Sequence, residues 1–257
     1  MTTKYSFRFG FTPDLDGFSC MELDRVLAAR KDLDMPIIRF YTWENPTISF
    51  GLNQNPGKRL KIERCLSDGI DMVARPTGGR EILHGWDLCC SVIWPIEERR
   101  SAPEFGRLFV RINGILSNGL RNMGINARTH AVSIKAAIAD GPCFSQIDRG
   151  EISVEGKKIV ASAQRIFDRA VLQQSSISIV RPEFDLMDYM SMRGKSDRKS
   201  SIVNSGAYVE GILEETFSIP RIVENFETVF KSELGESVFF DFRKDRIFKE
   251  TDTDREN

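Results

Sequence analysis

The sequence predicts an α+β domain, because patterns typical of helices and patterns typical of strands alternate along the chain without an internal repeat. Apolar side chains recur at helical spacing over residues 103–123, whereas polar and apolar residues alternate over residues 151–154 as in a strand. Of the 257 residues, 41% are hydrophobic and 28% are charged, the composition of an ordinary globular protein. We therefore expect a single domain over residues 1–240 and a polar tail over residues 241–257.

The first part of the chain is expected to hold two helices and four strands. Phe18, Met21 and Val26 are spaced to face a core from a helix over residues 18–31. Pro46 marks a turn between two strands, and Gly69 ends a short helix. The strands are expected over residues 37–43, 47–50, 71–75 and 88–94, the last as a mostly apolar, buried run, and the short helix over residues 60–67.

The second part begins with the clearest helix, over residues 103–123, in which Pro103 fits the first turn and Gly124 follows the last. A Glu-Gly turn at residues 155–156 joins two strands of a hairpin. A final helix over residues 220–234 starts at a proline and is closed by Gly235. Strands are expected over residues 151–154, 158–164 and 170–180, and a mobile loop over residues 192–201.

The bulk properties argue against several classes of protein. A net charge of −1 leaves no overall basic excess to neutralise phosphates, so we expect no nucleic-acid partner. No apolar run approaches the roughly 20 residues that a membrane span needs, so we expect a cytoplasmic protein without a membrane partner. Five scattered cysteines argue against a disulfide framework. His84 and His130 stand apart and no Cys-x-x-Cys occurs, so we expect no metal site.

Residues 141–165 are the stretch best suited to chemistry. Cys143 follows a proline in a polar loop, and the hairpin after it carries Lys158. A cysteine can hold an acyl group as a thioester, and a nearby ammonium can lower the pKa of the thiol or polarise the acyl carbonyl. The pair therefore indicates acyl transfer. Alternation along the strand places Lys157 on the opposite face from Lys158, so only one of the two can point inward.

Several ordered motifs resemble those of the lipoate-protein ligase and octanoyltransferase superfamily, which is related to biotin protein ligases. Residues 16–24 are similar to the family's first helix, and residues 50–55 to its short strand-and-loop signature. Residues 75–84 resemble the Arg-x-Thr-Gly-Gly-Arg-x-x-x-His element that binds the acyl chain or acyl-adenylate. The Pro-Cys-Phe at residues 142–144 resembles the cysteine-dependent octanoyltransferase branch, whereas the ATP-dependent ligases have an Asn-Asp pair there.

The resemblance implies a fold of mixed, largely antiparallel sheets with packed helices, in which the single domain is catalytic. It implies that Cys143 is the nucleophile and that Lys158, matched by a Gly-Lys-Lys-Ile pattern, lies against the acyl carbonyl. The substrate-binding residues that it implies are Arg75, Thr77, Gly78, Gly79, Arg80, His84, Ala161, Ser162 and Gln164.

Each candidate also has a simpler explanation. Cys143 can be an ordinary loop residue, and Lys158 a solvated lysine on a strand. The Gly-Gly pair can be a tight turn between strands, and His84 a buried core histidine. For the other cysteines burial as small apolar residues is the better explanation: Cys20, Cys65, Cys89 and Cys90.

Four positions depart from the family pattern. Glu81 stands where a small apolar residue is usual, and Ala161 replaces a glycine, where its Cβ could block a ligand or forbid a positive φ. Cys89-Cys90-Ser91 replaces a Thr-Tyr-Ser-like strand, and Gln174-Ser175-Ser176 replaces a His-Gly-Ser element. These changes bear on the identity of the substrate and on whether turnover is retained.

The resemblance implies a two-step transfer without metal or nucleotide. Octanoyl would pass from acyl carrier protein to Cys143, and then to a lysine of a lipoyl domain or of a glycine-cleavage H-like protein. One alternative is a lipoate-protein ligase that uses ATP and Mg²⁺ and forms an acyl-adenylate. A second is an inactive homologue that binds the acyl group or the carrier. Because carriers and lipoyl domains are generally acidic, a local basic surface is expected to dock them, and its candidates are Arg193, Lys195, Arg198 and Lys199, with Arg149 and Lys157.

Overall fold

The structure, a computed structural model, describes residues 6–96, 102–130, 143–145, 150–191, 206–213 and 217–243. Its strands are β1 (Phe7–Leu15), β2 (Ile37–Trp43), β3 (Thr47–Gly51), β4 (Asp71–Arg75), β5 (Ile82–His84), β6 (Asp87–Pro95), β7 (Arg128–Thr129), β8 (Ile152–Val154), β9 (Lys157–Ile166), β10 (Ala170–Ser178) and β11 (Ser237–Phe239). Its helices are α1 (Gly17–Ala29), α2 (Pro56–Arg59), α3 (Ile62–Ser67), α4 (Ala102–Asn122), α5 (Leu186–Tyr189) and α7 (Ile219–Leu234), with short 3-10 turns η1 (Cys143–Ser145) and η3 (Val209–Gly211).

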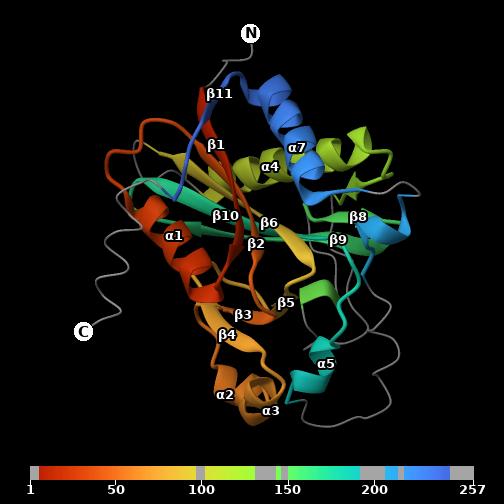
Figure 1. Cartoon of the computed structure of the whole chain (residues 1–257). Helices are drawn as coiled ribbons and strands as arrows, with labels where there is room; N and C mark the ends of the chain where they lie inside the picture. Colours follow the sequence, from red (N-terminus) through yellow and green to blue (C-terminus); the bar gives the residue numbers. More distant parts are fainter. Residues whose placement is uncertain are drawn as a thin grey trace.

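Two sheets organise the chain (Figure 1). The larger has eight strands in the order β11-β1-β2-β6-β10-β9-β8-β7, and the smaller has three in the order β4-β3-β5. In the large sheet β1 pairs in parallel with both β2 and β11, and the remaining neighbours are antiparallel. In the small sheet β3 is parallel to β4 and antiparallel to β5. The expected α+β fold of mixed, largely antiparallel sheets is confirmed.

Helices cover both faces of the large sheet, because successive side chains of its strands point to opposite faces. Ile38 belongs to the core beneath α4 and α7, whereas its neighbour Ile37 packs with α1 on the other face. The helices α4 and α7 also contact each other, and a Cβ at Gly119 of α4 would lie 2.3 Å from the ring of Phe226. A glycine is therefore needed where these two helices approach most closely.

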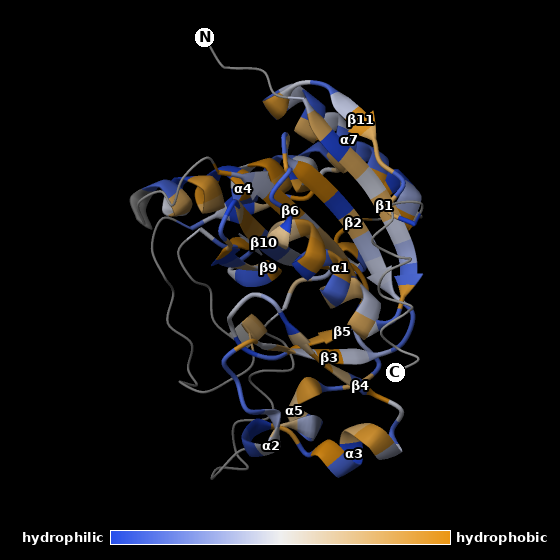
Figure 2. Ribbon diagram, turned by 90° about the vertical axis from the view of Figure 1, so that its left-hand side faces the viewer, coloured by the Kyte–Doolittle hydropathy of each residue, from blue (hydrophilic) through white to orange (hydrophobic). Residues whose placement is uncertain are grey.

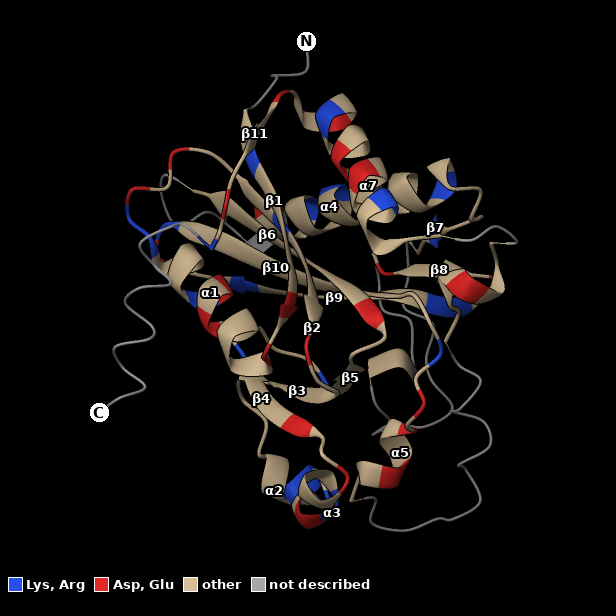
Figure 3. Cartoon of the chain, viewed as in Figure 1, with Lys and Arg blue, Asp and Glu red and all other residues tan. Residues whose placement is uncertain are grey.

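The small sheet and the short helices α2, α3 and α5 lie below the large sheet (Figure 2). They share a separate apolar cluster that includes Ile48 from β3, Cys65 from α3 and Met187 from α5. In the large sheet β10 is buried along its whole length and carries no charged residue (Figure 3). Its polar residues, Gln173 to Ser176, are therefore held in the interior, where they must find hydrogen-bond partners.

The structure differs from the expected elements at several places. The expected helix over residues 60–67 is present as the shorter α3 (Ile62–Ser67), because Leu60 is extended as the C-cap of α2, a separate helix over Pro56–Arg59 that was not expected. The strands β1, β5, β7 and β11 and the helix α5 were not expected. Phe242 is 1% exposed and packs with residues of α1, so the folded core extends past the expected boundary at residue 240. The rest of the expected tail, 244–257, and the expected loop, 192–201, lie outside the described residues.

Candidate active site

A cavity of about 200 Å³, here called the acyl cavity, lies between the large sheet and the small sheet. Its walls come from α1, from strands of both sheets (β2, β3, β5, β6, β9 and β10), from the 75–80 loop and from η1. Several of the expected site residues line it: Arg75, Gly79, Arg80, His84, Cys143, Ala161 and Ser162. Segments that are far apart in the sequence therefore meet at one site.

Cys143 begins η1 and is half-buried, whereas Cys20, Cys65, Cys89 and Cys90 are buried. Its backbone N–H donates a hydrogen bond of 3.2 Å to the carbonyl oxygen of Glu81, which ties η1 to the 75–84 segment. Burial raises the pKa of the Cys143 thiol, and the positive charge of Lys158 offsets only part of this effect. The expectation that a nearby ammonium lowers the thiol pKa is therefore correct in direction, but burial is the larger effect.

Lys158 lies behind the nucleophile rather than in the cavity wall. Its side chain is buried, and its ammonium donates to the carbonyl oxygen of Cys143 at 2.8 Å and pairs with Glu151 at 2.6 Å. It also lies 5.8 Å from the centre of the Phe144 ring. Lys157 is exposed, which confirms the expected alternation of the two lysines. The lysine can therefore fix the position of η1 and place a positive charge beside the thiol.

The Gly-Gly loop is held by Arg75. The Nε and Nη2 atoms donate to the carbonyl oxygen of Gly78, and Nη2 also donates to that of Arg80. Nη1 donates to the carbonyl and hydroxyl oxygens of Ser49. These bonds use all five guanidinium donors. Arg75 thus organises the loop, and Arg80 lines the cavity.

A buried chain of hydrogen bonds continues from Arg75. Ser49 Oγ lies 2.7 Å from His84 Nε2, and His84 Nδ1 lies 2.7 Å from a carboxylate oxygen of Asp87. The ring of His84 also stacks on Trp43, with centres 4.1 Å apart. The Asp87 contact fixes the orientation of the ring, and the ring fixes Ser49. His84 is thus a buried, hydrogen-bonded residue, as its simpler explanation expects, and it also lines the acyl cavity.

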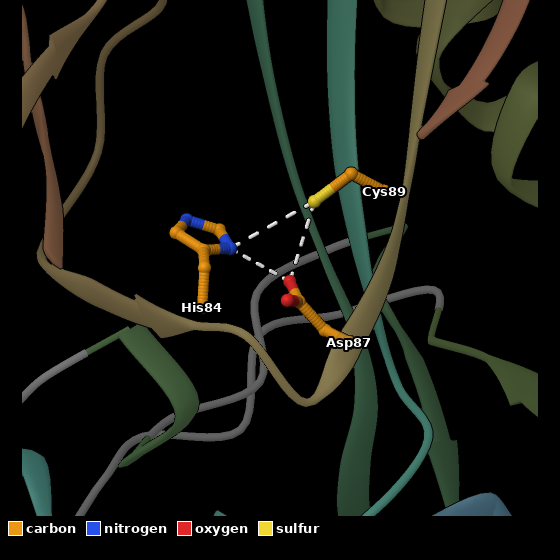
Figure 4. A group of neighbouring side chains, drawn as sticks. All are labelled: His84, Asp87 and Cys89. Carbon is orange, nitrogen blue, oxygen red and sulfur yellow. Dashed lines mark hydrogen bonds and ion pairs between the residues drawn. The ribbon is translucent and has the colours of Figure 1, made fainter. Parts of the chain in front are cut away.

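The Asp87 carboxylate also accepts from Ser176 at 2.6 Å and from Cys89 at 3.3 Å. His84, Asp87 and Cys89 have donor atoms within 4.8 Å of one another, the spacing of a metal site (Figure 4). Sequence spacing did not indicate this cluster. Burial acts to raise the pKa of Asp87, but the His84 contact and the two hydrogen bonds hold it below its usual range. These bonds account for the proximity of the three side chains.

The positions that depart from the family pattern have partners in the structure. Glu81 is 1% exposed and forms a bidentate ion pair with Arg59 of α2. Gln174 binds Thr77 Oγ1 at 2.8 Å and Asp24 at 2.7 Å. Ala161 lies in a regular ladder opposite Ser176, and it is not among the described residues with positive φ. Its Cβ therefore forms part of the cavity wall without backbone strain.

Some expected site residues are not part of the cavity wall: Thr77, Gly78, Lys158 and Gln164. Thr77 and Lys158 stand one layer behind it, whereas Gln164 pairs with Gln173. Residues that were not expected line the apolar part, among them Met21, Tyr41 and Trp43. Tyr41 and Trp43 are two positions apart on one strand, so the sequence could have predicted that their side chains lie on the same face of the sheet. Ser49 and Glu151 carried no comparable signal.

The family model for the lipoyl protein ligase A/B catalytic domain matches residues 16–231. An octanoyltransferase LipM from Carboxydothermus hydrogenoformans is 29% identical over 224 residues, which cover 86% of this chain and 82% of the relative. The LipM of Staphylococcus aureus is 30% identical over 240 residues, 87% of this chain and 85% of the relative. The LipM of Bacillus subtilis is 30% identical, with 78% and 75% covered.

Solved structures share the fold. A putative lipoate protein ligase from T. acidophilum, solved with bound lipoic acid, superposes with a TM-score of 0.70 at 19% identity and covers 98% of this chain and 96% of its own. A lipoate-protein ligase A bound with ATP also gives a TM-score of 0.70 at 19% identity, with 96% and 94% covered. Among the described residues, no helix is both long and apolar enough to cross a membrane.

Proposed function

Because the chain belongs to the lipoyl protein ligase A/B catalytic domain family, we propose that it is an octanoyltransferase that works through a thioester on Cys143. The observation that carries the proposal is the place of this cysteine. It is the half-buried member of the five, and it lines a cavity to which Met21, Tyr41, Trp43 and Ile82 contribute apolar surface. The curated relatives named octanoyltransferases support the choice of the acyl group.

The acyl cavity suits a medium-length hydrocarbon chain. Met21, Tyr41, Trp43 and Ile82 supply apolar surface within a volume of about 200 Å³. Burial of hydrocarbon contributes about 0.8 kcal/mol for each CH₂ group, so a C8 chain gains roughly 5 kcal/mol. That energy is sufficient to hold the acyl group in place while its carboxyl end reacts at Cys143.

In the first step Cys143 Sγ attacks the acyl carbon of the donor thioester, for which we propose octanoyl acyl carrier protein. The donor C–S bond breaks, and the donor thiol leaves with the proton that the Cys143 thiol has lost. Lys158 lies behind η1 and Arg80 lines the cavity, and the charge of each acts to lower the pKa of Cys143. The same charges favour the oxyanion of the tetrahedral intermediate.

In the second step a lysine amine of a lipoyl domain or of an H-like protein attacks the thioester. The acyl C–S bond breaks, an amide forms, and the thiol of Cys143 is restored. Exchange of one thioester for another is nearly isoenergetic, whereas formation of the amide makes the sequence favourable. This scheme uses the side chains described above, without nucleotide or metal.

Two other functions remain to be separated by experiment. A lipoate-protein ligase would activate the free acid with ATP, and one solved protein with the same fold is a lipoate-protein ligase A bound with ATP. A silent homologue would bind the acyl group or the carrier without reaction. The partnered Glu81 and Gln174 favour an intact site over a decayed one, because each departure has a specific compensating contact.

Intact-protein mass after incubation with octanoyl acyl carrier protein, with and without ATP, tests the proposal. We expect an octanoyl adduct that needs no ATP, that hydroxylamine removes, and that Cys143→Ser abolishes as a thioester. Cys65→Ser, a change in the cluster below the small sheet, is the control and should be acylated normally. Release of pyrophosphate with free octanoate and ATP, without a thioester from octanoyl acyl carrier protein, would indicate the ligase, and neither product would indicate a binding protein.

A further inference from the structure

A second cavity, of about 290 Å³, lies on the other side of the wall that Ile82 and Ser176 form for the acyl cavity. Cys143 faces the acyl cavity, and its neighbour Phe144 lines the second one. The two cavities therefore meet at η1, beside the reacting sulfur. A thioester on Cys143 with its chain in the acyl cavity leaves the second cavity as a place for the other reactant.

The walls of the second cavity are aromatic and apolar. Trp86 and Phe184 meet edge to face with ring centres 5.7 Å apart, and Phe144 and Tyr208 add two further rings. Aromatic faces attract cations, and apolar walls accept the methylene stem of a long charged side chain. Such walls suit an alkylammonium group better than a strongly hydrated anion.

The charged residues around the second cavity also favour a cation over an anion. Among the described residues, its lining contains four carboxylates, on Glu81, Asp87, Glu183 and Asp185, and one arginine, Arg181. Arg59 pairs with Glu81, and Asp87 is hydrogen-bonded to His84 and Ser176. In the rest of the lining, Glu183 and Asp185 are accompanied by Arg181. Figure 3 shows acidic residues in and just before α5. This excess of negative charge attracts an ammonium and repels a polyphosphate.

We propose that the second cavity binds the acceptor lysine, whose ammonium is attracted by Glu183 and Asp185 and whose stem lies against Trp86 and Phe184. This inference rests on the proposed function, because it assigns the second substrate of the same reaction. The ammonium loses one proton to solvent, and the neutral nitrogen then attacks the acyl carbon. The C–S bond breaks, Sγ keeps the electron pair, and a proton from the nitrogen restores the Cys143 thiol.

Aminolysis of preformed octanoyl-enzyme by Nα-acetyl-lysine N-methylamide, a probe whose only charge is its ammonium, tests the assignment. The test variant is Glu183→Gln with Asp185→Asn, in which Asn retains the side-chain oxygen that caps α5. Glu183 is exposed and Asp185 is partly buried, and loss of the attraction of both charges for the ammonium is expected to raise the half-saturating probe concentration about tenfold. The matched control is Glu63→Gln with Asp71→Asn, which removes two exposed carboxylates that line neither cavity, and it should behave as wild type.

An unchanged half-saturating concentration in the test variant would overturn the assignment. An equal rise in the half-saturating concentration of octanoyl-pantetheine in the acylation step would also overturn the assignment, because the cavity would then bind the pantetheine part of the donor. A second measurement needs no acyl-enzyme: fluorescence of Trp86 on titration with butylammonium, with butan-1-ol as the uncharged probe and Trp86→Phe to identify the signal. Saturable quenching by the cation alone, weakened in the test variant, is expected even if acylation fails. Equal responses to both probes would contradict the proposal.

Discussion

The ammonium nitrogen of Lys158 lies 2.8 Å from the backbone carbonyl oxygen of Cys143. The contact joins β9 of the hairpin to η1, and Glu151 holds the same ammonium from the other side at 2.6 Å. A buried lysine is therefore compensated by one carboxylate and used to position the turn that carries the nucleophile. The arrangement has consequences for the thiol that can be measured.

Replacing Lys158 by Met should make the Cys143 thiol harder to ionise. Burial already raises its pKa, and the lysine charge acts to lower it, so removal of that charge raises the pKa further. The rate of alkylation by iodoacetamide, which follows the thiolate, should then reach half its maximum at a higher pH. Lys157→Ala, a change on the exposed face of β9, should leave the profile unchanged.

Glu151→Gln should move the same profile in the opposite direction. The Glu151 charge acts to raise the pKa of Cys143, so its removal lowers the pKa and brings alkylation to lower pH. A shift in the same direction for the glutamate and the lysine variants would show that general disruption, rather than charge, controls the thiol.

The sequence predicted the part of the site that depends on local order, and the structure added what depends on the fold. The cysteine, the lysine and the 75–84 motif lie within short segments. Strand alternation showed that only one of Lys157 and Lys158 can point inward, and the resemblance to the family pattern chose Lys158, which is buried. No local sequence pattern predicted the contacts between segments that are distant in the chain. The place of Ser49 between Arg75 and His84 requires β3 to pair with both β4 and β5. The strand β1 was not predicted, although Phe7 and Phe9 alternate with other residues as in a strand. The residues before it contain no Gly, Pro, Asn or Asp that would mark a turn and so the start of a strand.

Gly79 and Gly78 should respond differently to alanine. Gly79 has a φ of 98°, and a Cβ there would lie 2.7 Å from Arg75 Nη2, whereas a Cβ at Gly78 would meet no atom within 4 Å. Gly79→Ala should lower the free energy of unfolding by roughly 1–2 kcal/mol from the left-handed backbone alone. Gly78→Ala should change it by less than about 0.5 kcal/mol. Urea unfolding monitored by tryptophan fluorescence measures both, and equal losses would contradict this account of the loop.

Asp87→Asn should weaken the hydrogen-bond chain that reaches Arg75. The asparagine amide cannot accept from His84, Ser176 and Cys89 together, so at least one buried donor is left without its partner. That loss should cost about 1–3 kcal/mol of stability. Because the 75–80 loop then loses support, KM for the octanoyl donor should rise more than kcat falls. A variant with wild-type KM and a low kcat would place Asp87 in the chemical step instead.

The most direct test of the central claim is a chase of isolated octanoyl-enzyme. The enzyme is acylated with radiolabelled octanoyl acyl carrier protein, separated from the donor and mixed with an apo lipoyl domain in the absence of ATP. We predict that the label leaves Cys143 and appears as a hydroxylamine-resistant amide on the domain, at a rate at least equal to overall turnover. A label that stays on the enzyme, or that transfers more slowly than turnover, would contradict a Cys143 thioester as the reaction intermediate.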